Sequence, residues 1–281
     1  MLFSDLALSR RLEAAEGYAC AQFALARRRL FPESGSEALR VAGADVVYDG
    51  PDAPTTQTFG LGMLEEATPE ALDRIEQFFA ARGAPVQHEV SPFAGVTTLE
   101  LLCGRGYRPI EISSVLYREI GAELGEEALP ARAAGKAAHI RVRAIGREEA
   151  ELWTEISARG WTHEHPELEE FMRQTGKTLA EREGSVCFLA EADGEAGAAG
   201  ALMIHEGVAL LAGAATVPEL RRRGLQLALL EARLLYAREH GCDLAMFVSE
   251  PGSNSQRNAE RQGFRIAYTR VKWKKLEAAG S

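Results

Sequence analysis

The sequence lacks the features that would place it in a specialised class of protein. No apolar run approaches the roughly 18 residues of a membrane-spanning helix. The first residues show no basic segment followed by an apolar one, so we expect no signal peptide. The 4 cysteines are scattered, without a Cys-x-x-Cys pair, and the 6 histidines are not at zinc spacing. We therefore expect reduced cysteines buried in the core, no bound metal and a cytoplasmic location.

Positive charge is also scarce. The chain has 32 Lys and Arg against 41 Asp and Glu, a formal net charge of −9. An acidic surface disfavours nucleic acid and anionic membranes, so we expect neither as a partner. Hydrophobic residues make up 46% and charged residues 26%, a balance typical of globular proteins that excludes disorder along the whole chain. A length of 281 residues suggests about two domains.

Helical and strand-like segments alternate along the chain, which predicts an α/β fold with a mixed sheet. Thr68-Pro69-Glu70 is typical of a helix start, and Ser253 followed by Gln256 forms a capping box. Asp193-Gly194 predicts a tight hairpin turn. We expect helices at 7–30, 70–82, 96–105, 148–159, 166–182 and 225–240, and a short one after Ser253. We expect strands within 38–48 and at 57–64, 86–90, 109–119, 139–144, 186–192, 198–205, 208–216, 243–248 and 264–273.

The two halves of the chain show the same order of elements. Gly83 and Gly241 lie 158 positions apart, and Gly106 and Gly263 lie 157 apart. A nearly constant offset indicates two copies of one fold, although two unrelated α/β halves remain the alternative. The segment 123–136 is rich in Ala, Gly and charge and lacks aromatic residues, as linkers do. We predict domains at 1–122 and 137–281.

A basic turn in the second half carries the clearest chemical signal. A buried strand ends at Thr216, the run Arg221-Arg222-Arg223-Gly224 follows, and a helix then begins. The backbone N–H groups at a helix start have no intrahelical partner and favour an anion, as does the helix dipole. Gly224 allows close approach of the backbone. The pattern predicts a phosphate-binding turn; the alternative is an exposed basic turn with solvated arginines, which could bind the acidic surface of a partner.

This stretch, with the strand, the capped helix and Gly263-Phe264 that follow, resembles the GNAT superfamily of acyl-CoA N-acyltransferases. The family signature is Arg/Gln-x-x-Gly-x-Gly/Ala, which Arg221 to Gln226 matches except that Gln226 replaces the small last residue. The resemblance covers roughly residues 138 to 275 and is fainter in the first half. It implies two GNAT-like domains in tandem and an N-acetyltransferase that moves an acetyl group from acetyl-CoA to an amine. The acceptor is a small-molecule or peptide amine that the sequence does not identify.

The resemblance also implies which residues bind acetyl-CoA. The donor would lie between the strands 208–216 and 243–248, where a backbone amide polarises the thioester carbonyl and the amine attacks directly. Backbone groups of Ala214, Ala215 and Thr216 would pair with the pantetheine arm. Ser255 and Asn258 would reach the same arm, unless they are merely surface polar residues. The pyrophosphate would be held by the backbone of Arg222, Arg223, Gly224, Leu225, Gln226 and Leu227, with Gln226 using only its backbone.

Two expected catalytic groups are missing. The position of the usual Tyr acid holds Ala259, and the position of the usual Glu base holds an apolar run at 246–248. Glu250 is the nearest carboxylate and is our candidate for the catalytic base, although it could simply cap a turn. The alternatives His163, Glu164 and His165 lie in a loop that usually shapes the acceptor pocket. Trp161 in this loop would wall that pocket or belong to the core.

The first half lacks the basic turn. Its corresponding segment carries Glu65, Glu66 and Glu70, and three carboxylates would repel pyrophosphate. We therefore expect a degenerate GNAT-like domain at 1–122 and one acyl-CoA site, in the second half. Because the usual acid and base are missing, a non-catalytic CoA-binding module with a regulatory or interaction role remains the alternative.

Overall fold

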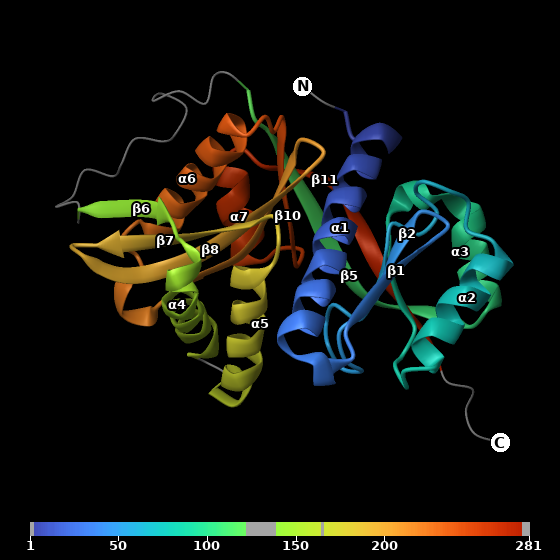
Figure 1. Ribbon diagram of the computed structural model, residues 1–281. Coiled ribbons are helices and arrows are strands. Elements are labelled where there is room, and N and C mark those ends of the chain that lie inside the picture. The colour runs from blue at the N-terminus through green and yellow to red at the C-terminus, as the bar shows by residue number, and fades with distance from the viewer. Residues whose placement is uncertain (1–2, 122–138, 164–165, 277–281) are drawn as a thin grey trace. The chain divides into compact units, whose positions relative to one another are not determined.

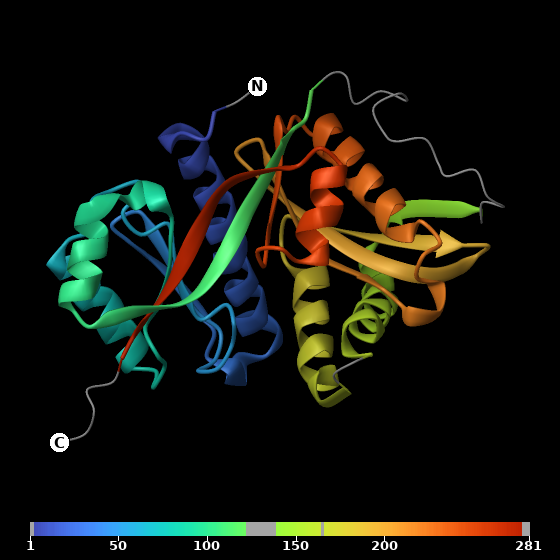
Figure 2. The same cartoon turned by 180° about the vertical axis from the view of Figure 1, so that it is seen from behind.

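The computed structural model describes residues 3–121, 139–163 and 166–276, which form two compact units (Figures 1 and 2). The first unit contains residues 1–118 and 246–281, and the second contains residues 119–245. Strand β10 (Leu244–Ser249) therefore begins in the second unit and ends in the first. The predicted linker 123–136 lies outside the described residues.

The first unit is a twisted sheet with helices on it. Its strands lie in the order β1-β2-β3-β4-β11-β5, and all adjacent pairs are antiparallel except β3 with β4. The strands are β1 (Glu37–Val41), β2 (Ala44–Tyr48), β3 (Gln57–Phe59), β4 (Gln87–Val90), β5 (Tyr107–Glu119) and β11 (Arg265–Lys275). The helices are α1 (Leu6–Leu30), α2 (Pro69–Ala80), α3 (Gly95–Gly104) and α7 (Asn254–Arg261).

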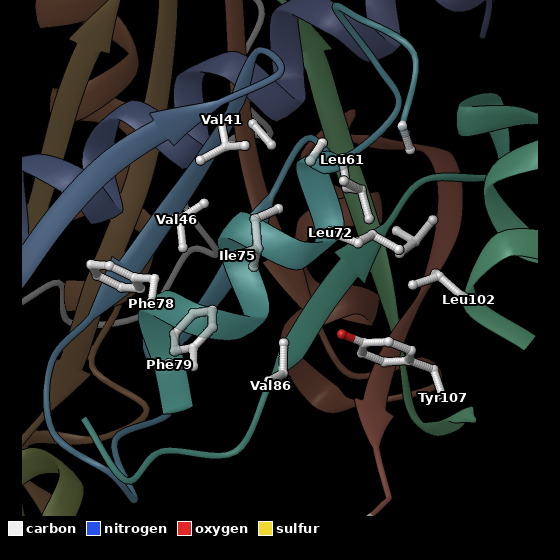
Figure 3. Packing of buried hydrophobic residues seen from close by; sticks show 14 of the residues in the cluster. Val41, Val46, Leu61, Leu72, Ile75, Phe78, Phe79, Val86, Leu102 and Tyr107 are labelled. Carbon is white, nitrogen blue, oxygen red and sulfur yellow. The ribbon is translucent and has the colours of Figure 1, made fainter. Parts of the chain in front are cut away.

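The core of this unit lies under α2 (Figure 3). Leu72, Ile75 and Phe79 repeat at helical spacing and are completely buried against the sheet. Thr68 caps α2 as predicted, because its hydroxyl accepts a hydrogen bond from the backbone N–H of Ala71. The predicted strand 57–64 is shorter than expected and ends at Phe59. The next residue, Gly60, has a φ of +73°, which turns the chain out of the sheet.

Strand β11 lies between β4 and β5, antiparallel to both. The last strand of the second half of the sequence therefore completes the sheet of the first unit. Its Arg270 is buried and makes two hydrogen bonds to the carboxylate of Glu16, of 2.6 and 2.8 Å. Glu89 lies 3.0 Å and Glu13 3.3 Å from the same guanidinium, and Tyr268 donates a hydrogen bond to Glu13. Burial raises the pKa of Glu13 and Glu89.

The second unit is an antiparallel meander with helices on both faces. Its strands follow the chain in the order β6-β7-β8-β9, and the β7–β8 hairpin turns at Asp193-Gly194 as predicted. Helices α4 and α5 pack on each other on one face of the sheet, and α6 lies on the opposite face (Figure 1). The elements are β6 (Ile140–Ala144), α4 (Ala150–Thr162), α5 (Glu169–Glu181), β7 (Ser185–Ala192), β8 (Glu195–His205), β9 (Val208–Thr216) and α6 (Leu225–Glu239).

The described residues bear on three expectations, which concern membrane spans, metal ions and cysteines. None of their helices has both the length and the apolar character needed to cross a bilayer. Within the same residues, no group of three or more His, Cys, Asp and Glu side chains is arranged to hold a metal ion. None of the four cysteines forms a disulfide; Cys187 and Cys242 are buried as expected, but Cys103 is exposed on α3 and does not belong to the core.

Candidate functional site

The basic turn follows the C-terminal end of β9 in the second unit and packs against β8. After β9, the residues 218–220 form a short 3-10 turn, and the backbone N–H of Val217 donates to the carbonyl of Gly197 at 2.9 Å. Leu220 is buried directly over Gly197, where a Cβ atom would collide with its side chain. Gly197 therefore allows the turn to pack down on β8, which fixes the start of α6 relative to the end of β9.

Helix α6 begins with unused backbone donors. Arg222 and Gly224 have left-handed φ angles of +64° and +89°, and Gly224 is the cap residue, so no side chain caps the helix. The N–H of Ala228 donates to the carbonyl of Gly224 at 3.0 Å, which is the first bond of the helix. The N–H groups of Leu225, Gln226 and Leu227 therefore have no helical acceptor. Such a helix start is a binding site for an anion such as a phosphate.

The three arginines of the turn have different roles. Arg221 donates to the carbonyl of Thr216 and to the carbonyl of Gly160, both at 3.2 Å, and so ties the turn to β9 and α4. Arg223 pairs with Asp193 in the β7–β8 hairpin. A hydrogen bond from the backbone N–H of His139, together with Arg223, lowers the pKa of Asp193. Arg222 has no hydrogen-bond or ion-pair partner among the described residues, which leaves its charge available for a ligand.

Gln226 contributes more than its backbone. Its side-chain amide donates a hydrogen bond of 2.8 Å to the hydroxyl of Thr216, joining the first turn of α6 to the last residue of β9. The expectation that Gln226 uses only its backbone toward the pyrophosphate stays a prediction. The side chain is directed to β9, which is compatible with the N–H group of Gln226 serving as an anion donor.

Strand β9 contains a β-bulge beside the turn. Ala215 pairs with Ala199 and Ala212 pairs with Ala201, so Gly213 and Ala214 together face the single residue Gly200. A bulge interrupts the ladder of backbone hydrogen bonds and re-aims the groups of the bulged strand. Gly213 has a φ of +60°, a conformation that glycine adopts without strain. The bulge and the basic turn thus lie at the same end of β9, within a few residues of each other.

The structure brings together the predicted residues 214–216 and 222–227, which all lie in the second unit. Glu250, Ser255 and Asn258 are exposed and lie in the first unit, and their roles stay predictions. Ser253 caps α7 as expected, with a hydrogen bond of 3.2 Å from the N–H of Gln256.

The loop proposed for the acceptor pocket is described only in part. Glu164 and His165 lie outside the described residues, whereas His163 is exposed at the end of α4. Trp161 is 51% exposed, which does not fit the alternative that it belongs to the core.

Sequence reasoning missed several residues that shape this site. Gly160 has its Cα so close to β9 that a Cβ atom would lie 2.6 Å from the Cβ of Ala215. Gly197 and Gly200 play similar roles on β8. Isolated glycines inside helix and strand patterns are a known sign of close backbone approach, and this signal was present in the sequence. Arg233, a buried charged residue on α6, carried no signal in the sequence.

Residues 149–264 match the model of the acetyltransferase (GNAT) family. Over this segment the chain is similar to the GNAT family. The match includes the bulge, the basic turn and all of α6. It ends at Phe264, immediately before β11. No curated protein sequence matches the chain significantly.

Solved structures extend the likeness in fold to nearly the whole chain. A GCN5-related N-acetyltransferase from Kribbella flavida is 19% identical, with a TM-score of 0.62 over 92% of this chain and 96% of its own. A tandem GNAT protein from the clavulanic acid biosynthesis pathway is 14% identical, with a TM-score of 0.60 over 99% and 98%. A GCN5-related N-acetyltransferase from Sphaerobacter thermophilus is 15% identical, with a TM-score of 0.51 over 85% and 83%. The predicted fold class, two GNAT-like α/β domains in tandem, is confirmed.

Proposed function

We propose that the second unit binds acetyl-CoA at the basic turn and transfers its acetyl group to the amine of a small molecule or peptide. The observation that supports this most directly is the start of α6. Three backbone N–H groups without helical acceptors lie next to Arg222, whose charge has no partner among the described residues. These donors and this charge suit the pyrophosphate of CoA.

In this proposal the end of β9 holds the reacting part of the donor. Backbone groups of residues 214–216 pair with the pantetheine arm, and a backbone amide at the bulge donates a hydrogen bond to the thioester oxygen, stabilising the negative charge that develops there. The amine nitrogen attacks the carbonyl carbon, the C–S bond breaks, and the CoA thiolate leaves. A base removes the proton of the amine, and Glu250 is the proposed base. The thiolate is protonated from solvent, because the position of the usual acid holds Ala259.

The first unit contrasts with the second at the corresponding helix. Helix α2 is capped by its own Thr68 hydroxyl, and Pro69 at its first position has no N–H group to offer. The segment before it is fixed internally, because Arg10 donates to the carbonyl of Met63 at 2.6 Å. Glu65 and Glu66 are exposed beside it. These features support the proposal that the first unit is a degenerate domain without a CoA site.

A non-catalytic CoA-binding module is the second candidate. It is favoured by the residues at the usual catalytic positions: Ala259 is a buried alanine, and Met246 is completely buried in β10. Neither side chain can exchange a proton. The two candidates differ in turnover, because only the enzyme releases CoA thiol from acetyl-CoA when an amine is supplied. A thiol-release assay of the full chain against a panel of primary amines separates them.

The CoA site is tested by calorimetric titration of CoA into the full chain and its variants. Gly224→Glu places a side chain and a negative charge among the anion donors and is expected to abolish binding. Gly241→Glu is the matched control, because Gly241 ends the same helix with a φ of +77° and has open space around its Cα. Both variants place a side chain at a left-handed φ, and only the first is at the turn.

Arg222→Ala is expected to weaken CoA binding by about 10-fold, since it removes one charge and leaves the backbone donors. If the Gly224 variant binds CoA with the affinity of the Gly241 variant, the turn is not the site. Binding that is lost in both variants would point to loss of structure in α6, which circular dichroism would show.

A further inference from the structure

Arg233 is a buried cation on α6 without an acidic partner. It is 4% exposed, and no carboxylate of the described residues forms an ion pair with it. Its Nε donates to the carbonyl of Leu229 at 3.2 Å, one turn earlier in the helix. Burial lowers the pKa of Arg233 to about 10, which still leaves it charged at neutral pH. Burying an unpaired charge is unfavourable, so the position of this side chain calls for an explanation beyond packing.

The guanidinium lies against the bulge in β9. Its Nη1 donates to the carbonyl of Ala201 at 3.2 Å and lies 3.5 Å from the carbonyl of Ala212. These two alanines are register partners, and the ladder breaks immediately after them. Arg233 therefore holds both strands at the residue pair where the bulge begins.

Gly200 makes room for this contact. It is the residue that faces the bulge, and a Cβ atom on it would lie 3.2 Å from the Cζ of Arg233. Its φ is not left-handed, so the glycine is needed for space and not for backbone conformation. The sequence thus supplies both a buried cation and the gap that lets it reach the backbone at the bulge.

The position of the charge has an electrostatic consequence. The carbonyl of Ala212 and the N–H of Gly213 belong to one peptide group. A cation that approaches the carbonyl oxygen polarises this peptide and makes its N–H a stronger donor. Hydrogen bonds from a charged donor also hold the peptide plane in one orientation. On the opposite face of the sheet, Leu179 and Trp153 lie close to Gly213 and limit its movement.

We infer that Arg233 is a positioning residue for acyl transfer: it fixes the bulge of β9 and strengthens the backbone donors that bind the thioester oxygen. The inference rests on the proposed function, because it requires acetyl-CoA along β9. Arg233 itself does not touch the substrate. Its charge acts through the backbone of the bulge, so no catalytic motif in the sequence includes it.

The test is the infrared spectrum of acetyl-CoA labelled with carbon-13 at the thioester carbonyl and bound to the full chain. A hydrogen bond to this oxygen lowers the carbonyl stretching frequency, and this frequency can be measured without an acceptor amine. We expect the frequency to fall when acetyl-CoA binds the wild type. Arg233→Met removes the charge at similar size and should diminish this fall. Arg233→Lys keeps the charge and should retain part of the fall in carbonyl frequency.

Leu234→Ala is the matched control, because Leu234 is completely buried on the same helix and is not among the residues named above as contacting the bulge. It should lower the thermal midpoint and retain the wild-type frequency. Titration with CoA, which lacks the thioester, should give affinities within about 3-fold of the wild type in all variants. If Arg233→Met does not fold, Gly200→Ala serves instead, because its Cβ would lie 3.2 Å from the Cζ of Arg233 and would shift the guanidinium by a few tenths of an ångström while the charge is retained. The fall in frequency should again diminish, but by less than in Arg233→Met.

The inference and the proposed function fail in different ways. If CoA does not bind the wild type, the proposed function is wrong and the inference falls with it. If CoA binds but the carbonyl frequency is the same in the wild type, the Arg233 variants and the Gly200 variant, the inference is overturned and the function is not. A loss of frequency shift in the Leu234 control as large as in Arg233→Met would also overturn it, because general loosening of the core would then explain the effect.

Discussion

Replacing Arg270 by Met removes a cation that contacts three buried or half-buried carboxylates. The guanidinium lies 2.6 Å from Glu16, 3.0 Å from Glu89 and 3.3 Å from Glu13. Methionine fills a similar volume in β11 and leaves the backbone pairs with β4 and β5 unchanged. Glu13 and Glu16 then lose this counter-charge, and Glu89 keeps only Lys272, 3.5 Å away, unless the carboxylates take up protons.

The expected loss of stability is large, because breaking a buried ion pair by removing one partner costs about 3–5 kcal/mol. For a unit of this size, about 2–4 °C of thermal midpoint corresponds to each kcal/mol, which gives a fall of about 6–20 °C. The fall should be greater at pH 8 than at pH 5. Burial already raises the pKa of Glu13 and Glu89. The charge of Arg270 lowers both pKa values, so its removal raises them further. At pH 5 more of these carboxyls are protonated, and the missing charge then matters less.

The measurement is thermal unfolding of the full chain, followed by calorimetry and circular dichroism at the two pH values. Arg265→Met is the control, since Arg265 is exposed on the same strand. Equal shifts in the two variants would refute the view that the ionic cluster anchors β11. A fall of the Arg270 variant that is independent of pH would show that the carboxylates do not carry the effect.

Two further predictions concern single carboxylates. Glu13→Gln keeps an acceptor for Tyr268 and removes a carboxyl whose pKa is raised by burial. Because that pKa is raised, the wild type loses stability as pH rises from the ordinary value of 4.5 through the folded value, and the variant should therefore gain in thermal midpoint relative to the wild type over that range. A difference between the two midpoints that is independent of pH would contradict this. Glu250→Gln should lower kcat by about 10²–10⁴-fold with CoA affinity unchanged if Glu250 is the base. A wild-type rate and pH profile in that variant would exclude Glu250 and direct attention to His163.

Most of the fold was predictable because the signals are local. The cap at Thr68, the capping residue Ser253 and the turn at Asp193-Gly194 each depend on a few neighbouring residues, and each is where the sequence places it. The order of helices and strands follows from hydrophobic periodicity for the same reason. The basic turn was also found, since an arginine run with a glycine before an apolar helix is a continuous pattern.

The features that the sequence did not show depend on residues far apart in the chain. The pairing of β11 with β4 and β5 joins positions more than a hundred residues apart, and nothing local to β11 indicates its neighbours. The three arginines of the turn look alike in sequence, but Arg221 and Arg223 are held by Gly160 and Asp193. Their different roles come from tertiary contacts, which periodicity does not contain.

The place of β11 decides how this protein can be divided for study. The family match ends at Phe264, and the strand that follows lies in the sheet of the first unit. Cutting the chain within 123–136 would separate Arg270 from Glu13, Glu16 and Glu89, and would leave both edges that β11 covers without a partner. Exposed strand edges and unpaired buried carboxylates both favour misfolding. A half that fails to bind CoA could therefore fail because it is unfolded, so binding has to be assigned by point variants in the full chain.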